Sequence, residues 1–220
     1  MALRDHDFAS QAAHPDDLTP RSRWVGARMT LDEFLALPEE ETSLEFDDGL
    51  VTQKMAPQSD HGSLQYQFAK RLDLAGEMRE LGKVFSETRF VTSDWSPVPD
   101  VSYYRRERIE AESEDEIGDL HIPPDIAVEI VSPRQSVSEM LRKCLRYAEL
   151  GVPISLVIDR TDRSVYDIRP GGHLRVLIGD DQIDLEPVLP DFNLTVSALF
   201  ATVVNRWMRK KAPAEPPATE

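Results

Sequence analysis

The segment that most constrains the fold is residues 126–131, where five of six side chains are apolar. An almost unbroken apolar run of this length is typical of a strand that is buried on both faces of a sheet. Ser136 and Glu139 then form a capping-box pattern, which predicts a helix that ends at Gly151. A second apolar run occupies residues 154–158. The pattern predicts a strand–helix–strand unit with two parallel strands and a right-handed crossover.

Other segments predict further helices and strands around this unit. Thr30 and Glu33 form another capping-box pattern, ahead of a short helix that stops at Pro38. The Asp48-Gly49 pair separates two β-prone segments and predicts a hairpin over residues 43–52. A long amphipathic helix is expected over residues 61–81, closed by Gly82, and a final helix over residues 196–207. Short strands are expected within residues 83–91, 99–104, 165–168 and 174–178.

Length and composition favour one compact domain in a chain of 220 residues, 40% of them hydrophobic. We expect a flexible leader over residues 1–27, a domain over residues 28–208 and a flexible tail over residues 209–220. No apolar stretch approaches the ~18 residues of a membrane span, and the N-terminus has no apolar core of a secretory signal. The single cysteine, Cys144, excludes an internal disulfide framework and fits the reducing cytoplasm. The sequence therefore predicts a cytoplasmic protein that does not bind membranes.

The formal net charge of −15 argues against tight, non-specific binding to nucleic acid. Part of the excess lies between residues 107 and 119, where seven carboxylates accompany a single arginine, Arg108. We interpret this run as a solvated acidic loop.

Glu129 is unusual because it lies inside the apolar run of residues 126–131. A buried carboxylate without a partner costs several kcal/mol or becomes neutral. Pairing with an arginine, or exposure on a half-covered sheet, would account for it. Asp100 follows Pro99 at the start of another predicted strand, where it also fits an ordinary strand-start role. If the two acids converge, their repulsion favours a divalent cation between them, and Mg²⁺ suits such a pair.

Lys143 lies in the helix after the Glu129 strand, at the border of the apolar stripe. One interpretation is a surface partner of Glu139 at i,i+4 spacing. The other is a lysine that points back toward the end of the sheet.

The order and spacing of several short motifs resemble the Uma-type family of restriction endonucleases, a branch of the PD-(D/E)xK nuclease superfamily. The resemblance covers roughly residues 28–200, and the ordered set is more specific than any single motif. The motifs are Glu45 with Asp48-Gly49, His61, Pro99-Asp100-Val101, Val128-Glu129-Ile130-Val131-Ser132-Pro133, Lys143 with Tyr147, Gly151-Val152-Pro153, Val157-Ile158-Asp159 and Val188-Leu189-Pro190-Asp191-Phe192.

The resemblance implies an α/β (α+β) restriction-endonuclease-like fold, a mixed central sheet flanked by helices. It also implies that Asp100 and Glu129 hold Mg²⁺ or Mn²⁺. The superfamily lysine stands two residues after the acidic residue, where this chain has Val131, so Lys143 is expected to replace it. Glu45 and His61 match family positions and are candidates for accessory roles, although a strand-surface glutamate and a helix-terminal histidine fit equally well.

The function implied by the resemblance is metal-dependent hydrolysis of phosphodiester bonds in nucleic acid, with DNA favoured as partner. A homodimer follows only by analogy with the superfamily. Two alternatives stay open: a catalytically degenerate module that binds or regulates, and a metal-dependent hydrolase of another phosphate substrate. A serine hydrolase finds no support, since the sequence has no G-x-S-x-G motif.

Overall fold

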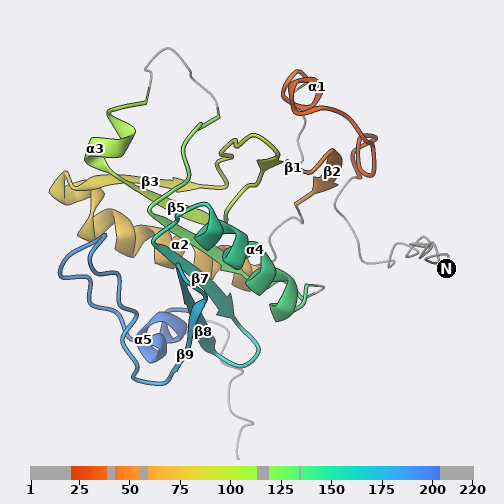
Figure 1. The fold of residues 1–220 in the computed structure, drawn as a ribbon. Helices are drawn as coiled ribbons and strands as arrows, with labels where there is room; N and C mark the ends of the chain where they lie inside the picture. Colours follow the sequence, from red (N-terminus) through yellow and green to blue (C-terminus); the bar gives the residue numbers. More distant parts are fainter. Residues whose placement is uncertain (1–20, 39–42, 55–58, 113–118, 134, 204–220) are drawn as a thin grey trace, which may run out of the picture.

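The computed structural model describes residues 21–38, 43–54, 59–112, 119–133 and 135–203, and within these residues the strands form two sheets. The larger is mixed and has the order β3-β5-β6-β7-β8-β9 (Figure 1). Its strands are β3 (Gly82–Ser86), β5 (Val101–Arg105), β6 (Ile126–Ile130), β7 (Ile154–Asp159), β8 (Ser164–Arg169) and β9 (His173–Ile178). The smaller is antiparallel, with the order β2-β1-β4, and comprises β1 (Leu44–Asp47), β2 (Leu50–Gln53) and β4 (Trp95–Ser96).

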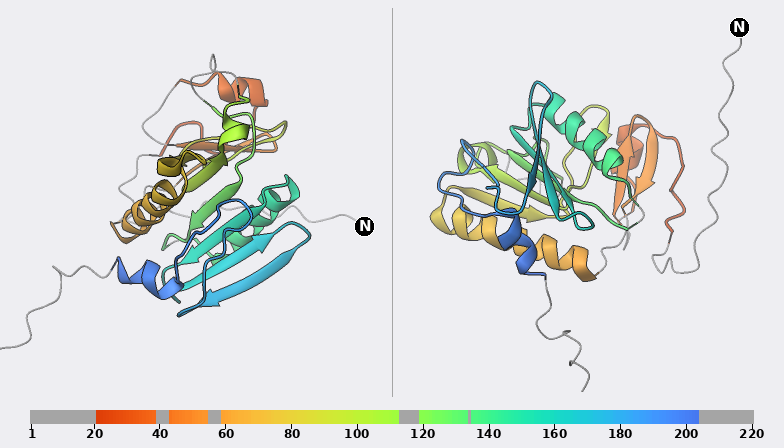
Figure 2. Two further views of the ribbon diagram at one scale, coloured as in Figure 1. Left: turned by 90° about the vertical axis from the view of Figure 1, so that its left-hand side faces the viewer. Right: turned by 90° about the horizontal axis from the view of Figure 1, so that it is seen from below.

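Helices cover both faces of the large sheet. Figure 2 shows α4 (Val137–Glu149) on one face, with α2 (Ser59–Ala75) and α5 (Val196–Ala201) on the other. Three shorter elements complete the described chain: α1 (Leu31–Leu35), the 3-10 turn η1 (Glu77–Arg79) and α3 (Arg106–Ile109). No helix among the described residues is long and apolar enough to cross a bilayer. The predicted mixed sheet flanked by helices is therefore confirmed.

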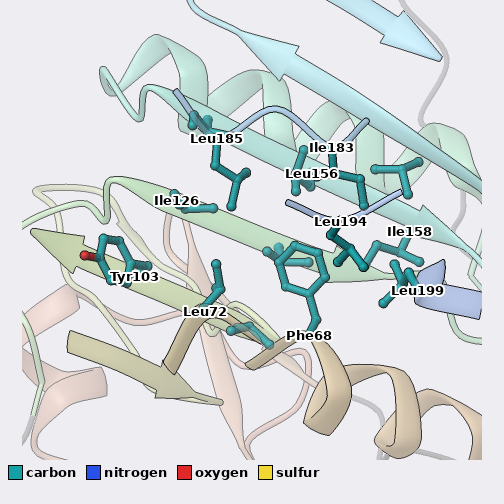
Figure 3. Packing of buried hydrophobic residues seen from close by; sticks show 14 of the residues in the cluster. Phe68, Leu72, Tyr103, Ile126, Leu156, Ile158, Ile183, Leu185, Leu194 and Leu199 are labelled. Atoms are coloured by element: carbon teal, nitrogen blue, oxygen red, sulfur yellow. The ribbon is translucent and has the colours of Figure 1, made fainter. Parts of the chain in front are cut away.

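The central strands are buried, as their apolar composition predicted. All side chains of β6 and β7 are buried, and the two strands pair in parallel with α4 between them in the chain. Phe68 and Leu72 of α2 pack toward Leu156 and Ile158 of β7 in the larger core (Figure 3). Cys144 and Tyr147 of α4 belong to a second core on the opposite face. The strand–helix–strand unit thus forms the centre of the protein.

Local capping signals predicted helix starts correctly. Thr30 with Glu33 and Ser136 with Glu139 both make the reciprocal contacts of a capping box, at the starts of α1 and α4. The Asp48-Gly49 hairpin also forms as predicted, between β1 and β2. Asp48 and Gly49 both have positive φ, the conformation that two-residue hairpin turns require and that Asp-Gly pairs adopt readily.

Two predicted helix ends were wrong or lie outside the described residues. The helix expected to run to residue 81 ends at Ala75, and Gly82 begins β3 instead of capping it. Gly82 is required there because a Cβ atom would lie 2.2 Å from the carbonyl oxygen of Tyr104 on the paired strand. The final helix ends at Ala201, and residues 204–207 of the prediction lie outside the described residues.

The packed chain also begins earlier than the predicted boundary at residue 28. Gly26 donates its amide to the carbonyl of Val51, and Val51 donates to Ala27, so this segment pairs with β2. Trp24 and Val25 pack against the small core behind the β1–β2 hairpin. Short-range patterning missed this contact because it depends on a strand more than 20 residues away. The rest of the predicted leader, residues 1–20, and the predicted tail, residues 209–220, lie outside the described residues.

Candidate active site

Asp100 and Glu129 stand opposite each other on neighbouring antiparallel strands. Val101 of β5 is the register partner of Val128 of β6, so one step further along the ladder places Asp100 across from Glu129. Directly opposed residues project from the same face of a sheet. The amide of Ile130 donates to Asp100 Oδ2 at 2.6 Å, which draws this carboxylate toward β6. Both acids line one cavity of about 70 Å³ at the end of the large sheet, so the predicted convergence is what the fold produces.

Lys143 reaches the same cavity from α4. Its Nζ lies 2.9 Å from Glu129 Oε1 and 2.7 Å from Glu45 Oε1. Glu139, the alternative surface partner, instead accepts a hydrogen bond from the amide of Ser136 in the capping box. The lysine side chain is only 15% exposed. Of the two orientations that the sequence allowed, the structure has the one toward Glu129.

Further hydrogen bonds hold these side chains in place. The hydroxyl of Tyr147, one turn after Lys143 on α4, donates to Glu129 Oε1 at 2.7 Å. The Tyr147 ring is itself fixed between Phe90 and Trp95, with ring centroids 5.7 and 5.0 Å away. Such packing restricts the rotamer of the tyrosine and thereby the position of the glutamate that it contacts.

Glu45 belongs to the small sheet and bridges it to the large one. The amide of Val98 donates to Glu45 Oε1 at 2.8 Å, in the connection that leads to Asp100. With Lys143 on the same oxygen, Glu45 joins α4 to the segment ahead of β5. The candidate accessory residue is thus in contact with the site, rather than exposed on a strand surface.

His61 faces the site from the first turn of α2 and is buried. Its Nε2 lies 3.2 Å from Asp100 Oδ1, and its Nδ1 lies 3.1 Å from Ser132 Oγ. Two residues contact this histidine from different strand ends, so its ring orientation is set on both sides. All five residues singled out in the sequence therefore meet at one place.

Lys54 is a member of the site that the sequence did not single out. It follows β2 directly, and its Nζ lies 2.8 Å from Asp100 Oδ1 and 2.9 Å from the carbonyl oxygen of Val98. The side chain is 11% exposed. A lysine at the end of a short hairpin strand carries no local signal that distinguishes it from a surface lysine. Only its register in the small sheet brings it to Asp100.

The surroundings shift the pKa values of the two central carboxyls in opposite directions. Burial alone would raise the pKa of Asp100, but the charge of Lys54 and the contact with His61 outweigh it and hold that pKa well below its usual range. Burial raises the pKa of Glu129, and the charge of Asp100 adds to the rise against the opposing effect of Lys143. Two adjacent acids with divergent pKa values are a common feature of catalytic sites.

Glu45 and Lys143, which join the small sheet to α4, form an ion pair in which each favours the charged form of the other. Burial would raise the pKa of Glu45, yet the charge of Lys143 prevails and lowers it. Burial also opposes the charge on Lys143, but Glu129 and Glu45 together raise its pKa well above the ordinary range. Lys143 therefore stays protonated at any physiological pH.

Asp100 and Glu129 have the donor atoms that a hard divalent cation needs. Lys54 Nζ and His61 Nε2 lie 2.8 and 3.2 Å from Asp100 Oδ1, but within the described residues no hydrogen bond of good geometry satisfies this buried atom. The contacts of Glu129 within the described residues all fall on Oε1, and its other oxygen, Oε2, makes none of them. No cluster of three or more His, Cys, Asp or Glu side chains suited to a metal occurs in the described part of the chain. Mg²⁺ needs no such cluster, because it takes one or two carboxylates and completes its octahedron with water and phosphate oxygens.

The mixed six-stranded sheet flanked by helices matches a nuclease fold. A family model described as Uma2, "Putative restriction endonuclease", matches residues 31–197, and the chain belongs to this family. A crystal structure of a protein from Anabaena variabilis, described as a "putative nuclease belonging to DUF820", is 29% identical with a TM-score of 0.73. The match covers 80% of this chain and 99% of that one. No curated protein matches significantly.

Proposed function

We propose that the protein is a metal-dependent endonuclease that hydrolyses phosphodiester bonds of nucleic acid, with DNA as the favoured substrate. The observation that carries the proposal is the opposition of Asp100 and Glu129 in one cavity, with the Lys143 ammonium held beside them. Membership of a nuclease family agrees with it.

In this proposal Asp100 and Glu129 hold Mg²⁺ or Mn²⁺. Such an ion, when bound, lowers the pKa of a water ligand and neutralises negative charge on a phosphoryl group. Lys143 provides a fixed positive charge for the non-bridging oxygens of the reacting phosphate, where charge grows in the transition state. Tyr147 keeps Glu129 in place, and His61 orients Asp100.

Lys143 fills the role that the superfamily motif assigns to a lysine two residues after the acidic residue. Val131 stands at that position and is buried in the core under α4. Because the side chain just after β6 contributes to packing, the required positive charge comes from α4, the helix that packs over this strand.

The direct test is cleavage of supercoiled plasmid, linear duplex, single-stranded DNA and RNA in the presence of Mg²⁺ or Mn²⁺, with EDTA as the metal-free control. We expect nicking or linearisation of plasmid that depends on the metal and disappears in Glu129→Gln. Cleavage that persists in EDTA or in Glu129→Gln would contradict the proposal.

A degenerate binding module is the second candidate, favoured by the net charge of −15 and by the lysine already paired with each central acid. Binding of nucleic acid by gel shift, with no cleavage under any metal, would support this alternative. Cleavage of small phosphate esters in place of nucleic acid would instead indicate a phosphoesterase.

A further inference from the structure

Lys54 occupies a distinctive position in the site because it contacts Asp100 Oδ1, a buried carboxylate oxygen to which the described residues donate no hydrogen bond of good geometry. Its Nζ is 2.8 Å from Asp100 Oδ1, while Asp100 Oδ2 already accepts the amide of Ile130. The lysine enters from the small sheet, whereas Asp100 belongs to the large one. The cation therefore lies at the same oxygen that the proposed function assigns to the metal.

The two lysines of the site differ in what they leave available. Lys143 contacts Glu129 through Oε1, together with Tyr147, so its ion pair does not involve Oε2. Lys54 contacts Asp100 through Oδ1 and has a second partner in the carbonyl of Val98 at 2.9 Å. Lys54 can thus release the carboxylate and keep one hydrogen bond.

We propose that Lys54 is a resident cation that competes with the divalent metal for Asp100 Oδ1 and thereby sets how much metal the site requires. The inference rests on the proposed function, since it assumes that Asp100 is a metal ligand. It goes further by assigning a role to a lysine outside the family's motif.

Simple electrostatics supports the competition. An Mg²⁺ ion bound to a carboxylate oxygen lies about 2.1 Å from it. An ammonium 2.8 Å from that oxygen would then be one of two adjacent positive charges, so it must withdraw as the ion enters. A flexible four-carbon side chain permits such a movement.

The balance of charges points the same way. Counting His61 as neutral, the three site carboxylates (Glu45, Asp100 and Glu129) and the two lysines leave a charge of −1. With Lys54 withdrawn, three negative charges and one positive charge leave −2, which matches a divalent ion. Lys54 thus compensates the buried acids before the metal arrives.

The test is a titration of the full chain with Mn²⁺, in which the loss of the free-ion signal in electron paramagnetic resonance measures binding. We expect Lys54→Gln to lower the Kd for Mn²⁺ at least tenfold relative to wild type. Its melting temperature without metal should fall, and saturating Mn²⁺ should raise it by more than in wild type. Lys83→Gln is the matched control, because Lys83 pairs with Glu77 away from the site, and it should leave the Kd unchanged.

The possible outcomes separate this inference from the proposed function. If wild type and Lys54→Gln bind Mn²⁺ equally, or the variant binds more weakly, the inference is overturned while the proposed function stands. If neither binds Mn²⁺ at millimolar concentration, both are overturned. Should Lys54→Gln fail to fold, Lys54→Arg provides a second route. Its guanidinium should hold Asp100 more firmly and weaken Mn²⁺ binding, and an unchanged or tighter Kd would contradict the inference.

Discussion

The two ends of β6 each carry a buried carboxylate, but their surroundings differ. Asp125, just before the strand, is fully buried and has both oxygens occupied. Arg105 donates its Nε to Oδ1 and its amide to Oδ2, each at 2.9 Å, and Arg108 contacts Oδ1 at 3.1 Å. Arginine suits this task because its planar group donates in fixed directions. Asp125 therefore has the features of a structural residue.

Glu129, near the other end, lies beside a second acid in a cavity, and lysines supply the compensating charge. One oxygen of Asp100 lacks a hydrogen bond within the described residues. Burial alone thus does not distinguish a functional carboxylate from a structural one. The distinction lies in whether each carboxylate oxygen accepts a hydrogen bond of good geometry, and the predictions below test it.

The largest difference in metal binding and cleavage is expected between the variants Glu129→Gln and Asp125→Asn. Glu129→Gln should abolish both Mn²⁺ binding and plasmid cleavage, because it removes a metal ligand. The protein should stay folded, because burial of a charged Glu129 is itself unfavourable. Asp125→Asn should retain both activities and lose about 1–3 kcal/mol of unfolding free energy, since two charged donors lose a charged acceptor. Isothermal titration calorimetry and denaturant unfolding measure the two effects. If Asp125→Asn neither binds Mn²⁺ nor cleaves plasmid, the distinction between the two carboxylates is wrong.

Lys143→Met is expected to affect both cleavage and stability. Loss of a positive charge that stabilises the transition state should reduce cleavage by about 10²–10³-fold. Two buried carboxylates would also lose their shared partner, which should lower stability by about 3–5 kcal/mol. Lys143→Arg is the control, because it keeps the positive charge and should largely restore stability. Any loss of cleavage in this variant then reports on the position of the charge alone. A Lys143→Met protein as stable as wild type would show that the ion pairs contribute little.

The smallest effect concerns pH and Glu45. The folded pKa of this carboxyl is lowered below its ordinary value of 4.5, chiefly by Lys143 acting against burial. A depressed pKa contributes stability that is present above about pH 4.5 and is lost as the pH falls toward the folded pKa. The difference in melting temperature between wild type and Glu45→Gln should therefore be constant near neutral pH and narrow below pH 4.5. A difference that widens on acidification would contradict the assigned direction.

Much of the fold follows from patterns that extend over a few residues. The apolar runs of β6 and β7, the capping boxes of α1 and α4, and the Asp48-Gly49 hairpin are local signals, and each formed where the sequence predicted it. The same patterns marked Glu129 as an exception, because a charge within an apolar strand requires a partner. Asp100 and Lys143 were then identified through the order of motifs.

Tertiary structure decided how these groups meet. The β5–β6 register sets Asp100 against Glu129, and the docking of the small sheet delivers Glu45 and Lys54 from more than 40 residues away in the chain. Gly82, which was predicted to close a helix, instead begins β3, where its backbone lies against Tyr104 of the paired strand. Periodicity and caps act through neighbours in the chain, so they can be recognised in the sequence. Which cation reaches which carboxylate oxygen depends on the register and packing of distant strands, which no short pattern encodes.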